Sequence, residues 1–202
     1  MKNPMPGRGS RGFSLIEMLV VMALMLALVS LGIPALQNAL HQSKMRGMVQ
    51  EITVAMRLAR IDAIKTSSQG IVQIVPSTGP GVLPLVRAFS DRNSDGKLDA
   101  TDPVLASFYL PTGVSFEDEA GKLDKDSVDD FSVDPAAGPK MAIFTLDGSI
   151  QEPGAFRISD PYGNHMEVRV GLPKATARIE VRKFESGEWV SNGDKGKAWT
   201  WN

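Results

Sequence analysis

One glutamate, Glu17, lies near the start of a long apolar stretch, and its carboxylate is the first group in the chain that could do chemistry. Residues 18–36 contain no charged side chain and would extend about 28 Å as a helix, close to the hydrocarbon thickness of a bilayer. A charged side chain inside a bilayer costs about 3 kcal/mol on insertion scales. We therefore expect this carboxylate to pair with a positive group inside the membrane.

The segment before the apolar stretch, residues 1–12, carries three basic residues and no acid, so we expect it to stay on the cytoplasmic side. A cleavable secretory signal has a shorter apolar core that is followed by a site of small residues. Here the conspicuous boundary comes before the apolar stretch, between Gly12 and Phe13. Cleavage at that point would leave the apolar helix on the mature chain.

The sequence GFSLIE at residues 12–17 resembles the prepilin processing motif of type IV pilins and type II secretion pseudopilins. The resemblance implies that a membrane-embedded prepilin peptidase cleaves after Gly12 and methylates the new N-terminal residue, Phe13. It also implies that Glu17, the fifth residue after cleavage, pairs with the N-terminal amine of a neighbouring subunit and sets the register of assembly. The alternative is an ordinary single-pass anchor whose glutamate reaches the headgroups.

The composition fits a membrane-anchored protein with one outer domain. The chain has 202 residues, no cysteine and a formal net charge of −1, and removal of the basic leader makes the remainder more acidic. An acidic balance argues against general electrostatic binding of nucleic acid. Many major pilins carry a C-terminal disulfide, so a chain without cysteine is better matched by the minor pilins and pseudopilins.

The pattern beyond the apolar stretch predicts an α+β fold, a long N-terminal helix packed on an antiparallel β-sheet domain. We expect a leader at residues 1–12, a transmembrane half-helix at 13–36, an amphipathic half-helix at 37–66 and a β-rich domain at 67–202. The apolar positions of the second half-helix recur at three- and four-residue spacing and predict one buried face. These positions are Met45, Met48, Val49, Ile52, Ala55, Met56, Ala59 and Ala63.

Short apolar or alternating runs predict the strands of the outer domain. They are residues 71–75, 82–89, 104–110, 114–117, 131–133, 141–146, 155–158, 166–170 and 177–184. Residues 147–149, Asp-Gly-Ser, predict a hairpin turn into the next strand. The acidic segment 117–134 is predicted to be an exposed loop.

The order of these pieces resembles the GspH/FimT-type minor pilins. The short matches are an R-x-x-A helix end at residues 60–63, a D-x-N-x-D-G turn at 91–96, a D-x-V-L strand start at 102–105 and an F-x-x-x-G-S turn at 144–149. The closing G-R strand motif of that branch is not intact, since residues 177–181 read ARIEV. This departure weakens any inference of the DNA binding known for some FimT-type members.

A second candidate site is the acidic stretch of residues 91–102, which has the spacing of a calcium-binding loop with glycine at position six. The last position is an aspartate where calcium loops use a longer glutamate, and the flanking segments look like strands. The alternative is a solvated turn, because Asp, Asn and Gly favour turns for their own reasons. The expected ligands are Asp91, Asn93, Asp95, the carbonyl of Lys97, Asp99 and Asp102.

The sequence contains no arrangement of residues that favours catalysis. The two histidines, His41 and His165, have no nearby nucleophile and no metal-ligand spacing. We expect both to be structural or surface residues and the protein not to be an enzyme.

All three tryptophans, Trp189, Trp199 and Trp201, lie in the last fourteen residues among several lysines. Three interpretations are open: the rings cover the sheet core, they contact a partner pilin, or they stack on single-stranded nucleic acid.

Taken together, these features predict a minor pilin or minor pseudopilin that is anchored in the inner membrane with its C-terminal domain in the periplasm. After processing it would assemble with other minor and major pilins or pseudopilins into a type IV pilus or a type II secretion pseudopilus. We expect it near the filament tip, where it primes or caps assembly. The alternatives are a DNA-receptor pilin for DNA uptake and a membrane-anchored, calcium-dependent binding domain.

Overall fold

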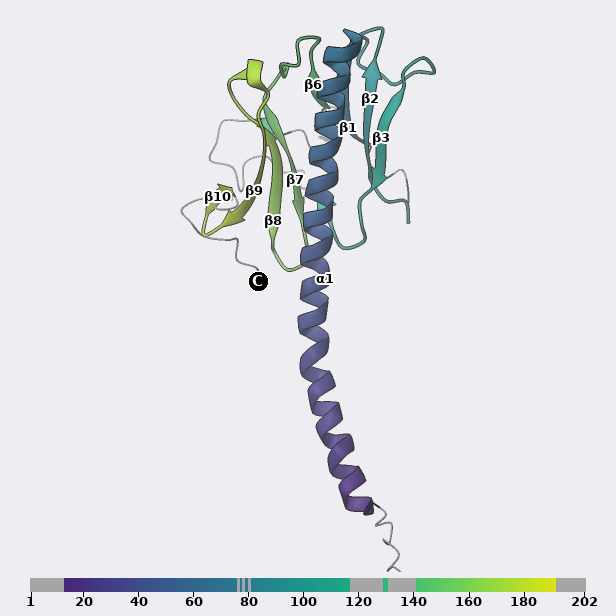
Figure 1. Ribbon diagram of the computed structural model, residues 1–202, viewed down its shortest axis with the longest axis vertical. Coiled ribbons are helices and arrows are strands. Elements are labelled where there is room, and N and C mark those ends of the chain that lie inside the picture. The colour runs from purple at the N-terminus through teal and green to yellow at the C-terminus, as the bar shows by residue number, and fades with distance from the viewer. Residues whose placement is uncertain are drawn as a thin grey trace, which may run out of the picture. The chain divides into compact units, whose positions relative to one another are not determined.

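The computed structural model describes residues 13–75, 77, 79, 81–116, 129–130 and 141–191, without the side chains of Leu31, Pro34, Ala35, Asp129 and Asp130. The chain divides into two compact units, Met1–Leu40 and His41–Asn202. The second unit contains all the strands and the C-terminal half of the one long helix (Figure 1).

The helix, α1, spans Leu15–Thr66. Its end agrees with the predicted boundary and has a clear cause, since Ser67 adopts a left-handed conformation with φ of 51°. The hydroxyl of Thr66 donates to the carbonyl of Asp62 at 2.7 Å and lies 2.6 Å from the Ser68 hydroxyl. These side-chain hydrogen bonds close the last turn and lead directly into the first strand.

The strands form two sheets. The first sheet has the order β3-β2-β1-β6 and consists of β1 (Gln69–Val75), β2 (Leu85–Asp91), β3 (Val104–Tyr109) and β6 (Met141–Phe144). The second sheet has the order β10-β9-β8-β7-β4, and β5 also pairs with β7. Its strands are β4 (Ser115–Phe116), β5 (Asp129–Asp130), β7 (Gly154–Ser159), β8 (His165–Val170), β9 (Ile179–Glu185) and β10 (Glu188–Ser191). A short 3-10 helix, η1 (Lys174–Thr176), lies between β8 and β9.

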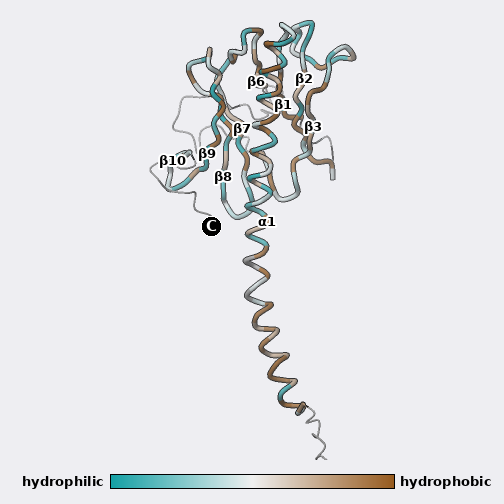
Figure 2. The backbone as a smooth tube through the Cα atoms, viewed as in Figure 1, coloured by the Kyte–Doolittle hydropathy of each residue, from teal (hydrophilic) through white to brown (hydrophobic). Residues whose placement is uncertain are grey.

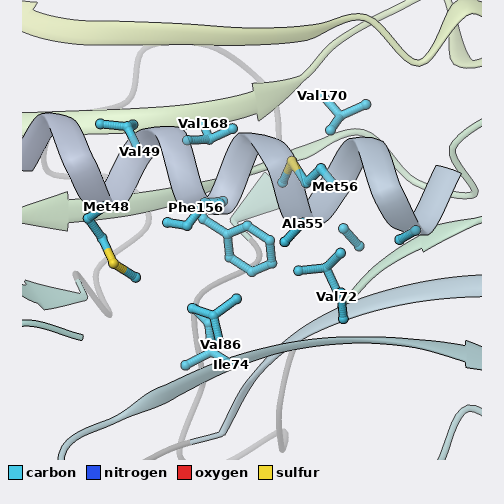
Figure 3. Packing of buried hydrophobic residues seen from close by; sticks show 14 of the residues in the cluster. Met48, Val49, Ala55, Met56, Val72, Ile74, Val86, Phe156, Val168 and Val170 are labelled. Carbon is cyan, nitrogen blue, oxygen red and sulfur yellow. The ribbon is translucent and has the colours of Figure 1, made fainter. Parts of the chain in front are cut away.

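The C-terminal half of α1 packs against both sheets and forms one core with them (Figure 3). Every apolar position that was predicted to lie on one helix face, from Met45 to Ala63, is buried. The first sheet contributes residues such as Val72, Ile74 and Val86, and the second contributes Phe156, Val168 and others. The 3.6-residue period of α1 and the two-residue period of the strands therefore meet in a single core.

Close packing between α1 and β1 depends on Gly70. A Cβ atom added at this glycine would overlap the backbone carbonyl of Ala59 on the helix. Small residues on both elements thus let the helix backbone approach the strand backbone directly. Any side chain at position 70 must push the helix away from the sheet.

The structure confirms the α+β class and corrects several details of the prediction. Strand β10 was not predicted, and β5 is a short strand inside the segment predicted to be a loop. This strand pairs with β7 in parallel, an exception to the antiparallel sheet. The strand predicted at residues 131–133 lies outside the described residues.

The turn at residues 147–149 also differs from the predicted hairpin. It reverses the chain and is closed by the Gly148 N–H, which donates to the Thr145 carbonyl at 2.8 Å, but the flanking segments pair only through an isolated bridge between Phe144 and Ile150. Strand β6 pairs with β1 of the first sheet, whereas β7 pairs with β8 of the second. The turn therefore carries the chain from one sheet to the other, and both sheets contribute to the core beneath the buried face of α1.

Candidate assembly site

The start of α1 is held by reciprocal hydrogen bonds between Ser14 and Glu17. The backbone N–H of Ser14 donates to Glu17 Oε2 at 3.0 Å, and the Ser14 hydroxyl donates to the same oxygen at 3.2 Å. The backbone N–H of Glu17 donates to Ser14 Oγ at 3.2 Å. This arrangement is a capping box, in which serine at the N-cap and glutamate three residues later satisfy two free N–H groups of the helix end.

The capping box gives Glu17 a structural contact within its own chain. Only Oε2 of the carboxylate takes part, and Oε1 accepts no hydrogen bond from the residues that the structure describes. The carboxylate of Glu17 thus lies in the first turn of α1, at the positive end of the helix.

The first half of α1 is hydrophobic along most of its length (Figure 2), and its large apolar side chains are exposed. Phe13 is 80% exposed, and the large apolar side chains that follow along α1 are exposed as well. Within residues 18–36 Ser30 has the one polar side chain, and its hydroxyl donates to the Ala27 carbonyl at 2.8 Å. Its donor is thereby satisfied without water.

Among the described residues, none of the helices has a stretch of the length and apolarity needed to span a membrane.

Residues 91–102, which have the spacing of a calcium-binding loop, begin at the last residue of β2 and form a loop that leads to β3. The carboxylate of Asp91 accepts the N–H groups of Ser94 and Gly96 at 2.7 and 2.8 Å. The carboxylate of Asp102 accepts the N–H groups of Arg92 and Asp99 at 3.0 and 3.1 Å. Both aspartates are buried and hold the ends of the turn together.

The remaining acids of this turn also contact their own loop. The Thr101 hydroxyl donates to Asp99 at 2.7 Å and is the main reason that the pKa of this carboxyl lies below its usual value. The carboxylate of Asp95 accepts the backbone N–H of Lys97, and the amide oxygen of Asn93 accepts that of Asp95. No group of three or more His, Cys, Asp or Glu side chains is placed to hold a metal ion in the described parts of the chain. Calcium binding here stays a prediction.

Titration of the full-length protein in detergent with calcium chloride tests that prediction. A calcium site would release heat that is lost when Asp95 is replaced by Ala, which removes the side-chain oxygen ligand that Asn would keep. Asp95 is exposed, so this replacement leaves the buried Asp91 and Asp102 in place. A turn without a calcium site would give no heat at millimolar calcium.

Trp189 and the two histidines each contact another aromatic ring of the sheet domain. Trp189 lies on β10, with its ring 5.3 Å from that of Phe184 and the Arg157 guanidinium 5.8 Å from its centroid. Trp199 and Trp201 lie outside the described residues. The ring of His41 packs edge-on against Tyr162, and that of His165 against Phe184.

The capping box and a buried ion pair were not predicted from the sequence. The capping box could have been predicted, since Ser14 precedes Glu17 by three residues at the start of an apolar stretch. The second is a buried ion pair, in which Arg157 Nε lies 3.3 Å from Glu167 Oε2 and each side chain is 2% exposed. Only the pairing of β7 with β8 brings these residues together, so no local pattern could reveal it.

Comparison with known proteins finds a match at the start of the chain. Residues 7–33 match the prokaryotic N-terminal methylation motif, which includes Gly12, Phe13 and Glu17. This motif is the signature of type IV pilin-like proteins, and it covers the leader boundary, the capping box and most of the apolar stretch. No curated protein and no solved structure matches the chain. The chain therefore carries the type IV pilin signature on a helix-plus-sheet fold consistent with a pilin.

Proposed function

We propose that the protein is a minor pilin or minor pseudopilin, which assembles through its N-terminal helix into a type IV pilus or a type II secretion pseudopilus. The methylation motif at residues 7–33 is the observation that carries this proposal. The motif lies at the start of a 52-residue helix, whose first half exposes apolar side chains and whose second half belongs to the folded domain.

The exposed apolar side chains of the first unit support the next step. Large apolar surfaces on a protein are contact sites for lipid or for other proteins. Before assembly, the helix would be anchored in the inner membrane with the leader in the cytoplasm and the sheet domain in the periplasm. During assembly, the same surface would pack against the helices of other pilin subunits.

Processing by a prepilin peptidase would create the amine that Glu17 needs. Cleavage after Gly12 converts the amide nitrogen of Phe13 into a charged N-terminus. The oxygen Oε1 of Glu17 has no donor among the described residues, so it can accept the N-terminal amine of a neighbouring subunit. An uncompensated carboxylate in lipid is costly, and this cost would favour the one register that pairs it.

The proposed role is mechanical and not enzymatic, because proteins with this motif are structural subunits. The position near the filament tip and the priming or capping role belong to the proposal. Support comes from the cysteine-free composition and from the short resemblances to GspH/FimT-type subunits.

An in-frame deletion strain, scored for secreted proteins and for surface pili, tests the proposal. Loss of secretion with normal pili places the protein in a type II secretion pseudopilus, and loss of pili with normal secretion places it in a type IV pilus. If only DNA uptake is lost, the DNA-receptor alternative replaces the proposed role. If all three are unchanged, the proposal is wrong.

A further inference from the structure

An open groove of about 750 Å³ lies in the sheet domain between α1 and the connection from β8 to β9. Its walls combine branched apolar side chains with basic ones. The residues that matter here are Ile61, Ile64 and Leu172 among the apolar ones, and Arg57, Arg60 and Arg178 among the basic ones.

The apolar side chains of the groove are exposed to an unusual degree for a folded domain. Leu172 is 69% exposed, Ile61 61% and Ile64 52%. Single exposed apolar residues are common, but three large ones grouped in a concave site mark a binding surface.

Hydrogen bonds hold the walls of the groove in place. The N–H of Ile150 donates to the carbonyl of Lys174 at 3.0 Å, and the Lys174 ammonium donates to the carbonyl of Gln151 at 2.8 Å. The N–H of Gly171 donates to the carbonyl of Arg178 at 3.1 Å and closes the loop that carries Leu172. A groove fixed in this way loses little entropy when it binds a partner.

The charged residues that line the groove, among those that the structure describes, are three arginines. Nε of Arg60 donates to the carbonyl of Gly148 at 2.9 Å, which holds its guanidinium beside the groove. Arg178 is 75% exposed and shares Glu180 with Arg182. Arg57 makes no hydrogen bond or ion pair within the described residues. None of the described lining residues is acidic, so the guanidinium groups of Arg57, Arg60 and Arg178 lie beside an apolar floor, with Glu180 paired to Arg178 outside the lining.

We propose that this groove binds a peptide segment of a neighbouring filament subunit that carries carboxylates next to branched apolar side chains. Guanidinium groups bind carboxylates in bidentate geometry, and the apolar floor accepts the side chains between them. None of the described residues that line the groove carries an aromatic ring on which a base could stack, so single-stranded nucleic acid fits less well. The neighbouring subunit as partner rests on the proposed function.

Site-specific photocrosslinking in living cells tests the proposal. A benzoylphenylalanine replaces Ile64 in the groove or, as a control, Val104 on β3. Val104 is a matched control because its side chain is 51% exposed and that of Ile64 is 52% exposed. Adducts are mapped by mass spectrometry in the wild-type background and in Arg57→Glu. Arg92→Glu, in the turn before β3, is the charge-reversal control.

The expected result is an adduct at Ile64 only, with an acidic and apolar segment of another protein that carries the N-terminal methylation motif. Arg57→Glu should lower its yield about fivefold, Arg92→Glu should not, and replacing the partner's acid with Lys should restore the yield in Arg57→Glu. An adduct with nucleic acid or lipid, a yield unaffected by Arg57→Glu, or no adduct at Ile64 in assembled filaments would overturn the proposal.

The filament fraction of the same cells separates this proposal from the proposed function. Processed protein in sheared filaments without an adduct at Ile64 contradicts the groove proposal alone. Unprocessed protein that never enters filaments contradicts the proposed function. If the protein stays unprocessed and Ile64 crosslinks to an acidic segment of a protein without the motif, the claim that the groove binds a filament subunit is wrong as well.

Discussion

Three substitutions at the start of α1 separate the capping role of Glu17 from its proposed role in assembly. Ser14→Ala removes the two hydrogen bonds of the hydroxyl and keeps the charge of Glu17. Glu17→Gln keeps a side chain that can complete a capping box and removes the charge. Glu17→Ala removes both. We expect Ser14→Ala to assemble and both Glu17 variants to fail.

The expected magnitudes differ enough to distinguish the two roles. Loss of an N-cap hydroxyl costs about 1 kcal/mol, roughly fivefold in the equilibrium of the first helical turn. That change is local, because the helix continues for 52 residues. Loss of a pairing that offsets a carboxylate in lipid is worth about 3 kcal/mol, roughly a hundredfold in subunit addition.

The assay compares each variant in a strain that lacks the native copy. Immunoblots of the membrane fraction report insertion and processing, and blots of sheared filaments report incorporation. All three variants should reach the membrane at equal levels, and only Ser14→Ala should appear in filaments near the wild-type level. Normal incorporation of Glu17→Gln, together with failure of Ser14→Ala, would refute the pairing and show that the capping box is what assembly needs.

Three further predictions concern the folded domain. Gly70→Ala should destabilise the full-length protein in detergent by about 3 kcal/mol in urea unfolding, because its Cβ overlaps the helix backbone, whereas Gly47→Ala, with open space around it, should stabilise by about 1 kcal/mol. Glu167→Leu should cost about 3 kcal/mol in the same assay, and adding Arg157→Met should recover most of that loss. The Thr145 hydroxyl, with Ser149, lowers the pKa of Asp147 to about 2, so its contribution to stability should be lost as pH falls from about 4 to about 2, and Asp147→Asn should flatten this part of the pH profile.

The long helix and its buried stripe could be predicted because they depend on local periodicity. Positions from Met45 to Ala63 follow one period over five turns, and all of them are buried. The helix end near Lys65 was readable from the turn-forming residues after it. Most strands were also predicted, with errors at their ends, because apolar alternation fades where a strand meets a turn.

The division into two sheets could not be predicted from local pattern. The turn at Asp147 looks like a hairpin turn by composition, yet the strands on its two sides join different sheets. Strand β10 has only four residues, and it is defined by its pairing with β9, in which Trp189 lies opposite Phe184. The Arg157–Glu167 pair and the groove near Leu172 arise in the same way, from segments that only the tertiary fold brings together.

The N-terminus of the mature protein tests the central claim most directly. Intact-mass and peptide analysis of protein extracted from membranes of the native host should show that residues 1–12 are absent and that the amine of Phe13 carries one methyl group. Replacement of Gly12 by a bulky residue should leave the leader in place and keep the protein out of filaments. A native chain that retains its leader, or one that is cleaved after the apolar stretch, would contradict the assignment as a type IV pilin-like subunit.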